Sequence, residues 1–366
     1  MDFDKIFIKD CCPTKTGGQA VMEGVMMRGP ERTAVAVRLP DNRIFMKTEM
    51  NPKRSALAKL PLVRGVISFV MSLVLGTRIL TYSADVLEYF TELEEDKETA
   101  GKEESADGGE NSDAESASAS DHGGNSSEEK PGWLERTFGK KAAWNILLFL
   151  SVAFALVVSI AVFVLLPTVV VNLLSGVVHN VILLNLIEGL FRIAMFLGYI
   201  VLISRMKDIR RVFEYHGAEH KTIHCYENGK ELTPENAKDF VRLHPRCGTS
   251  FLMFVMVISL ILFSLLGWPN LTMRIVSRLV LIPVVAAISY EILQWAGRST
   301  NRFVELVSVP GLLLQKLTTR EPDASELEVA IVSMKAVLVP PETPVFEGIT
   351  NTDAEFVEPM TIDRDA

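Results

Sequence analysis

The chain has 366 residues, of which 48% are hydrophobic, and a formal net charge of −8. The negative charge is concentrated in residues 91–130, which carry 14 acidic and 3 basic side chains, so the rest of the chain is weakly positive. No basic face indicates nucleic-acid binding. The cysteines do not suggest a disulfide framework, because Cys11 and Cys12 are adjacent and Cys225 and Cys247 fall in a segment expected to be cytosolic.

Residues 1–60 are expected to form a cytosolic segment. The run 17–30 contains four glycines and ends in a proline, which indicates a tight path with close backbone approach. The alternating stretches 33–38 and 44–49, joined by a Pro/Asp/Asn turn, predict a small β-hairpin.

Residues 61–90 contain an uninterrupted apolar run, 66–75, of 10 residues. A membrane span needs about 20. This region therefore predicts a membrane-surface or re-entrant helix flanked by Arg64 and Arg78, with a buried core helix as the main alternative. Residues 91–141 are acidic and rich in Ser and Gly, a composition typical of a disordered linker.

Four later segments are apolar enough to cross a bilayer, because about 20 helical residues span about 30 Å of hydrocarbon. They occupy 144–171, 182–204, 251–268 and 276–295, within the predicted membrane regions 142–204 and 251–296. Apart from the hairpin and cytosolic helical segments, the chain is therefore predicted to be an all-α multi-pass membrane protein with about four transmembrane helices.

Basic residues predict the orientation of these spans. Lys140 and Lys141 precede the first span, and Arg298 and Arg302 follow the fourth. The loop after the second span is also basic, whereas the connections 172–181 and 269–275 together contain a single basic residue, Arg274. Membrane proteins carry an excess of basic residues in their cytosolic loops. Both termini and residues 205–250 are therefore predicted to lie in the cytosol, and the chain is predicted to cross the lipid bilayer four times.

The C-terminal region is expected to begin with a cytosolic segment, residues 297–338, that ends in a helix. Ser325 and Glu328 form a capping-box pattern, which opens an apolar-periodic helix through about residue 337. The tail, residues 339–366, is rich in Pro and acidic residues and is predicted to be disordered.

The cytosolic segment 205–250 carries the residues that suggest chemistry, including four of the six histidines. On a helix, His216 and His220 lie one turn apart and can converge on one Zn²⁺, with Glu219 beside them. This H-x-x-E-H order is that of the inverzincins, in which the Glu is the general base toward water. His244 and Cys247 are the preferred distant ligands. The competing interpretation is a polar helix whose histidines bind carbonyls and carboxylates, and Gly217 weakens the helical premise.

Two further charged pairs have both structural and functional interpretations. Glu188 and Arg192 lie one turn apart inside the second predicted span, where pairing offsets the cost of burying charge. They predict either a structural ion pair or a substrate or proton path. Glu23 and Arg28, in the glycine-rich segment, could approach the cytosolic site or form a surface ion pair.

Seven motifs resemble the YqhQ-like bacterial membrane protein family, and the resemblance covers nearly the whole chain except the acidic linker and the tail. They are GGQAVMEGVMMRGP, YHGAEHK, NGKELTPENA, HPRCGTSFL, SYE, PGLLLQ and TTREPD. The resemblance implies a bacterial cytoplasmic membrane and a predicted metal-dependent enzyme of unknown function. By position it implicates His216, Glu219, His220, His244 and Cys247.

The leading hypothesis is a metal-dependent membrane hydrolase. Zn²⁺ would be held by His216, His220 and one or both of His244 and Cys247, and Glu219 would activate water. The substrate would be a lipid-linked molecule or a membrane-protein segment at the cytosolic interface. A second hypothesis is a non-catalytic accessory or scaffold factor in membrane-protein biogenesis. A third, weaker one is a transporter that uses Glu188 and Arg192, although no internal repeat is visible.

Overall fold

The computed structural model describes residues 3–7, 14–52, 60, 63–106, 146–147, 150–151, 153–155, 157–159, 161–266, 271–296 and 301–360. The chain divides into two compact units, residues 1–94 with 178–366 and residues 95–177. Cys11, Cys12 and residues 107–141 of the predicted acidic linker lie outside the described residues.

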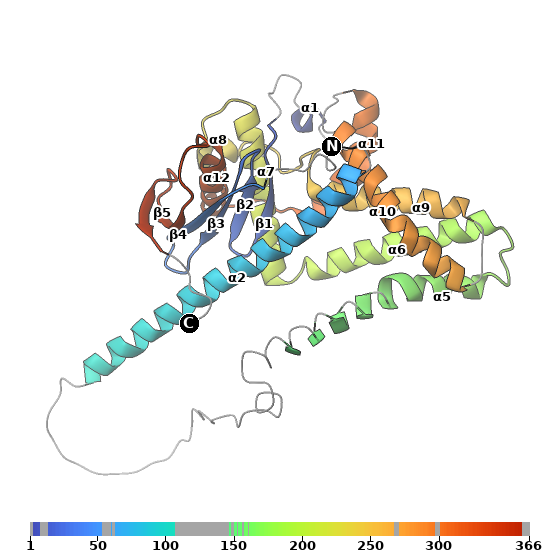
Figure 1. The fold of residues 1–366 in the computed structure, drawn as a ribbon, viewed down its shortest axis with the longest axis horizontal. Helices are drawn as coiled ribbons and strands as arrows, with labels where there is room; N and C mark the ends of the chain where they lie inside the picture. The colour runs from blue at the N-terminus through green and yellow to red at the C-terminus, as the bar shows by residue number, and fades with distance from the viewer. Residues whose placement is uncertain are drawn as a thin grey trace, which may run out of the picture. The chain divides into compact units, whose positions relative to one another are not determined.

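The larger unit contains a six-stranded antiparallel sheet with strand order β1-β2-β3-β4-β5-β6 (Figure 1). Its strands are β1 (Gly17–Val21), β2 (Gly24–Arg28), β3 (Arg32–Arg38), β4 (Ile44–Met50), β5 (Glu347–Thr350) and β6 (Phe356–Pro359). The predicted hairpin is confirmed as β3 and β4. The fold class was incomplete, however, because the chain is mostly helical but not all-α.

The other four strands correct two predictions. The glycine-rich segment forms the β1–β2 hairpin, in which Glu23 adopts a positive φ of 47° in the two-residue turn. The expected close approach is confirmed there, since a Cβ on Gly18 would lie 2.7 Å from the Met26 carbonyl oxygen. The tail predicted to be disordered contributes β5 and β6. Its partner β4 lies about 300 residues earlier in the chain, so local composition did not reveal the pairing.

Both faces of the sheet are covered by helices, which the alternation of side chains makes possible. One face, with Val25, Met27 and Ala36, packs against α7 (Lys207–Glu227) and α12 (Ala324–Leu338). The other face, with Met26 and Val35, packs against α2 (Val63–Ala106). The sheet is therefore the middle layer of three, and Figure 1 shows α2 running across its open side.

Helix α2 revises two sequence predictions. Its middle part, Leu75 to Leu93, is a core helix against the sheet, as the alternative interpretation of residues 61–90 proposed. It also continues through Ala106, so the predicted linker does not begin at residue 91. The reason is local, because the Glu, Lys and Ala residues of this stretch favour helix.

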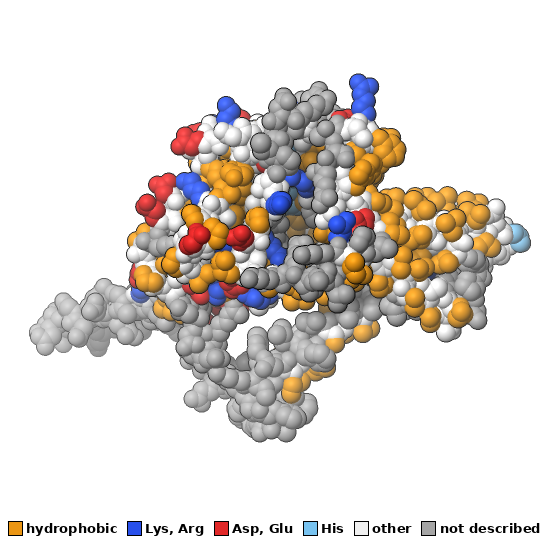
Figure 2. Space-filling view, turned by 45° about the horizontal axis from the view of Figure 1, so that its top comes forward, with side chains coloured by type: hydrophobic (Ala, Val, Ile, Leu, Met, Phe, Trp, Pro, Cys, Tyr) orange, Lys and Arg blue, Asp and Glu red, His pale blue; other side chains and the backbone are white. Residues whose placement is uncertain are grey.

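Five helices among the described residues are long and apolar enough to cross a membrane, by length and composition, against four predicted spans. They are Val63–Glu95 within α2, Ala153–Leu174, Val181–Ile203 (α6), Gly248–Leu265 (α9) and Val276–Ala296 within α10 (Leu271–Ala296). The second lies in the smaller unit and includes a π-helical turn, η2 (Ala161–Leu165), and α5 (Leu166–Leu174). Hydrophobic side chains dominate the right-hand part of the surface, where α6 and α9 lie (Figure 2).

The larger unit contains further helices. They are α1 (Phe3–Ile6), α8 (Pro234–Ala237) and α11 (Arg302–Thr318). The predicted C-terminal helix is confirmed as α12, but its capping box is formed by Asp323 and Glu326 rather than by Ser325 and Glu328. Glu328, two residues further along the helix, pairs instead with Arg38 of β3.

Candidate metal centre

Helix α7 carries the H-x-x-E-H residues and lies between the sheet and the loop that precedes α9. The helix is continuous through Gly217, which the sequence left in doubt. A Cβ at this position would collide with the Arg320 carbonyl oxygen, so glycine allows the chain after α11 to pack closely on α7. His216, Glu219 and His220 are consequently buried, with at most 8% of each residue exposed.

Hydrogen bonds to backbone carbonyls orient both histidine rings. Nδ1 of His216 lies 2.8 Å from the Thr318 carbonyl oxygen, and Nδ1 of His220 lies 2.6 Å from that of Arg242. A carbonyl only accepts, so each Nδ1 carries a proton, and each Nε2 is the atom left to bind a metal. Metal-bound histidines commonly have this arrangement, in which the second nitrogen is fixed by a carbonyl or carboxylate.

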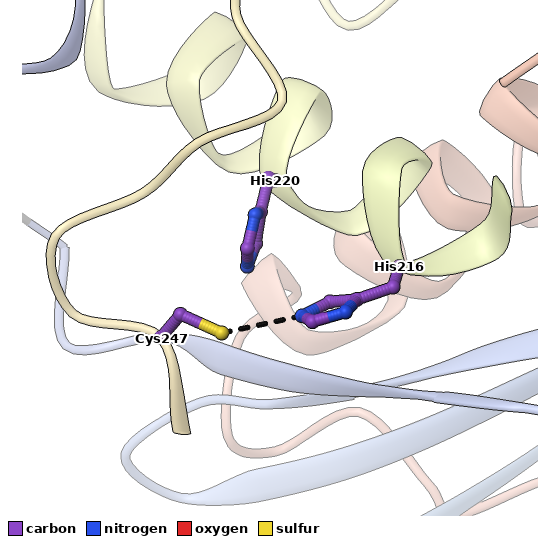
Figure 3. Close-up of side chains that lie close together, drawn as sticks. All are labelled: His216, His220 and Cys247. Carbon is purple, nitrogen blue, oxygen red and sulfur yellow. Dashed lines mark hydrogen bonds between the residues drawn. The ribbon is translucent and has the colours of Figure 1, made fainter. Parts of the chain in front are cut away.

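Cys247 completes the group from the N-cap position of α9 (Figure 3). Its Sγ lies 3.2 Å from Nε2 of His216, and the ligand atoms of His216, His220 and Cys247 all lie within 4.8 Å of one another. Within the described residues, Nε2 of His220 is buried and has no hydrogen-bond partner. A polar atom left unsatisfied beside a thiol and a second imidazole fits a zinc ligand set of two nitrogens and one sulfur.

The two histidines favour the thiolate form of Cys247. Burial by itself raises the pKa of this thiol, but His220 and His216 hold it well below its ordinary value. Burial likewise lowers the pKa of His216, yet Cys247 and Glu219 together raise it to about 9. The thiolate is the form that binds metals, and the helix N-terminus at Cys247 also favours negative charge.

Glu219 lies beside this group but is held from the other side. The backbone N–H of Gly18 in β1 donates to its carboxylate, while Oε2 has no hydrogen-bond partner in the part of the chain that the structure describes. Burial raises the pKa of this carboxyl, and the two neighbouring histidines oppose that rise. The result is a buried carboxylate with one oxygen available, close to three metal-ligand atoms.

His244 does not join His216 and His220, although the sequence and the family resemblance both included it. It lies instead with His224 and Glu227 in a second group whose ligand atoms are within 4.8 Å of one another. Gln315 of α11 fixes this position, since it accepts from the His244 backbone N–H at 2.9 Å and donates to its carbonyl at 2.8 Å.

The second group is already neutralised by a cation. Arg246 forms an ion pair with Glu227 and reaches within 3.5 Å of Nε2 of His244. The Thr14 backbone N–H donates to the same carboxylate at 2.7 Å. A guanidinium in this place repels a metal ion, so the first group is the better metal centre. From the sequence, one ion could take His216 and His220 or His220 and His224, and the first pair was preferred. Glu227 was not considered, although its spacing from His220 and His224 along α7 places all three on one side of the helix.

The remaining predicted pairs are also resolved. Glu23 accepts from Nε of Arg211 at 2.8 Å and from the Tyr215 hydroxyl at 3.2 Å, which ties the β1–β2 turn to α7 just before His216. Glu188 and Arg192 form the predicted ion pair at 3.0 Å. Arg278 of α10 adds a second, two-pronged contact to Glu188, which the sequence did not indicate.

Comparison with known proteins identifies relatives but no described activity. The model of a family described as "Protein of unknown function (DUF1385)" matches residues 60–339. A Bacillus subtilis (strain 168) protein named "Uncharacterized protein YqhQ" is 34% identical over 334 residues, covering 89% of this chain and 93% of the relative. No solved structure matches.

Proposed function

The chain belongs to the DUF1385 family, and from its site we propose that it is a zinc-dependent membrane hydrolase. His216, His220 and Cys247 hold the metal, and Glu219 is the general base. The observation that carries this proposal is the pair of imidazoles, each fixed by a carbonyl at Nδ1, whose Nε2 atoms converge with the Cys247 thiolate.

The described residues supply three ligands, and that number favours a catalytic site over a structural one. Structural zinc sites have four protein ligands, whereas catalytic sites have three and leave one position for water or substrate. The zinc would supply Lewis-acid polarisation of a substrate oxygen and lower the pKa of water. The chain supplies the proton acceptor, since a buried carboxylate whose pKa is raised is suited to accept a proton near neutral pH.

The position of Cys247 supports a substrate at the membrane interface. This residue directly precedes α9, one of the helices apolar enough to cross a bilayer. In the proposed topology, α6, α9, α10 and residues 153–174 cross the bacterial cytoplasmic membrane, and both termini are cytosolic. A lipid-linked molecule or a membrane-protein segment would then reach the site from the cytosolic face.

Metal analysis of the purified protein tests the proposal. Wild type should contain close to one zinc per chain, and the His216→Ala/His220→Ala variant should contain almost none. His179→Ala is the matched control, because His179 is exposed and outside both histidine groups. Equal, substoichiometric zinc in wild type and the double variant would exclude the proposed centre.

Glu219→Gln separates the enzyme from the scaffold hypothesis. The amide keeps the shape of the side chain and can still accept from Gly18, but it cannot accept a proton. In a strain lacking the gene, an enzyme with this substitution should bind zinc yet fail to restore any phenotype that wild type restores. A scaffold should restore it fully.

A further inference from the structure

The middle of helix α2 packs against the sheet. Ile79, Tyr82, Val86 and Phe90 are all buried against the face of the sheet that carries Val35 and Phe45. The hydroxyl of Ser83 also accepts from the Met22 backbone N–H at 3.3 Å. Residues 79–93 of α2 therefore lie on the same side of any membrane as the sheet.

The N-terminal part of α2 contacts the ends of two spanning helices next to the metal centre. Phe69 packs on Phe251, near the start of α9, with ring centroids 5.5 Å apart. Nε of Arg64 donates to Glu291, near the end of α10, at 2.7 Å. Both contacts lie toward the ends of α9 and α10 that carry Cys247 and Ala296. This part of α2 therefore packs against those two helix ends.

The length of α2 before the sheet excludes a crossing. Strand β4 ends at Met50 and Ile79 packs on the same sheet, so the chain between them returns to the side that it left. Residues 63–78 of α2 span about 24 Å, which is less than one passage through about 30 Å of hydrocarbon. A second passage back is impossible within this length.

This part of α2 nevertheless exposes apolar side chains along one face. Val63, Val70, Leu73, Val74 and Leu80 are each between 42% and 61% exposed, and they recur at spacings of three, four and seven residues. Such spacing places them on one side of a helix. The helices that α2 contacts, α9 and α10, also expose apolar side chains, among them Ile261 and Val280.

We propose that residues 63–80 of α2 lie in the surface of the phospholipid bilayer, with this apolar face in the headgroup region, and that α2 does not cross the membrane. The helix would thereby hold the sheet and α7 against the cytosolic leaflet. Amphipathic helices bind membranes in this orientation, with their apolar face about 5–10 Å below the surface.

Depth measurements in vesicles of phosphatidylethanolamine and phosphatidylglycerol test this proposal. A fluorescent amino acid is placed singly at Val63, Val70 or Leu80 of the full chain, and its quenching by lipids brominated at different depths is recorded. Leu190 in α6 is the deep control and Val357 in β6 is the aqueous control, since both are exposed. Only labelled proteins that keep the wild-type thermal unfolding midpoint are compared.

A surface helix places all three positions at one shallow depth. A spanning helix separates residues 63 and 80 by about 25 Å in depth, which would overturn the proposal. Absence of quenching at all three positions would overturn it too, and would indicate that a protein covers this face. An independent measurement uses a fluorescent protein inserted after residue 120. It should lie on the same side of the membrane as one at the C-terminus, because β4, which precedes α2, pairs with the C-terminal strand β5. Opposite sides would show that α2 crosses and would overturn the proposal.

Discussion

The backbone of Gly18 in β1 lies directly against the carboxylate of Glu219 in α7. A Cβ at residue 18 would be 2.8 Å from Cδ of Glu219, and the Gly18 N–H donates to this carboxylate. Two segments about 200 residues apart thus meet at the proposed general base. The contact gives the glycine-rich motif a role in positioning the carboxylate.

Gly18→Ala should therefore displace Glu219 while leaving the metal ligands in place. We expect zinc content to stay at the wild-type value, activity to fall, and stability to decrease by about 1–3 kcal/mol, as for other overpacked sites. Gly17→Ala is the matched control, because a Cβ there meets nothing within 4 Å among the described residues. Loss of zinc in Gly18→Ala would show that the contact supports the metal ligands instead.

The two described cysteines allow a paired test of the thiolate ligand. Cys247→Ser should lower zinc content strongly, because a serine hydroxyl is not deprotonated at neutral pH and binds Zn²⁺ far less well than a thiolate. Cys225→Ser should keep its zinc, since Sγ of Cys225 lies 3.3 Å from the Glu231 carbonyl oxygen and belongs to neither histidine group. Elemental analysis gives the zinc content of both proteins. Equal zinc in the two variants would contradict the assignment of Cys247 as a zinc ligand.

Glu227→Gln should distinguish the two histidine groups. The substitution removes the charge partner of Arg246 but none of the proposed zinc ligands. We expect unchanged zinc and a lower thermal unfolding midpoint. The free energy of unfolding should decrease by about 1–3 kcal/mol. Breaking a fully buried ion pair costs about 3–5 kcal/mol, but Arg246 is partly exposed. A protein that loses its zinc on this change binds metal at the second group.

Stability should fall in mild acid because His224 is kept neutral. Burial lowers the pKa of its imidazole to about 3, with His244 adding to the effect. Below pH 6.5 the unfolded chain gains a proton that the folded chain does not, so stability is lost as the pH falls from 6.5 toward 3. Between pH 7 and pH 5 this one residue should cost about 2 kcal/mol.

His224→Gln removes this titration and retains a side-chain donor toward the Leu243 carbonyl, which lies 2.9 Å from Nε2 of His224. Unfolding curves of both proteins are measured at pH 7, 6 and 5. Between pH 7 and pH 5 the stability of wild type should fall by about 2 kcal/mol more than that of the variant, whatever the packing cost of the substitution at pH 7. An equal decrease in the two proteins would show that His224 is not buried in its neutral form.

The sequence was most informative where a local pattern is sufficient. Apolar length located α6, α9 and α10, alternation located β3 and β4, and one helical turn placed His216 beside His220. Cys247 was a correct choice of neighbour for them, because it lies just before α9 in a loop long enough to return to α7. Whether these residues bind zinc stays a prediction.

Non-local contacts account for what the sequence did not reveal. Strands β1 and β2 are rich in Gly and Met and lack alternation, and β5 needs β4 to form a ladder. His244 sits only three residues before Cys247, yet Gln315 turns it toward Glu227, and no spacing rule contains that information. The apolar run in α2 gave no sign that the residues after it, Ile79 to Leu93, pack against the sheet.

The pairing of β4 with β5 has a consequence for synthesis. The Thr48 N–H donates to the Phe346 carbonyl at 2.7 Å, so a strand made early is completed by residues that leave the ribosome about 300 residues later. At about 5–20 residues per second, the edge of β4 waits roughly 15–60 s. An open strand edge is a template for wrong pairing. The nascent chain must therefore be protected until translation is almost complete, and a chain that stops before residue 347 leaves that edge uncovered.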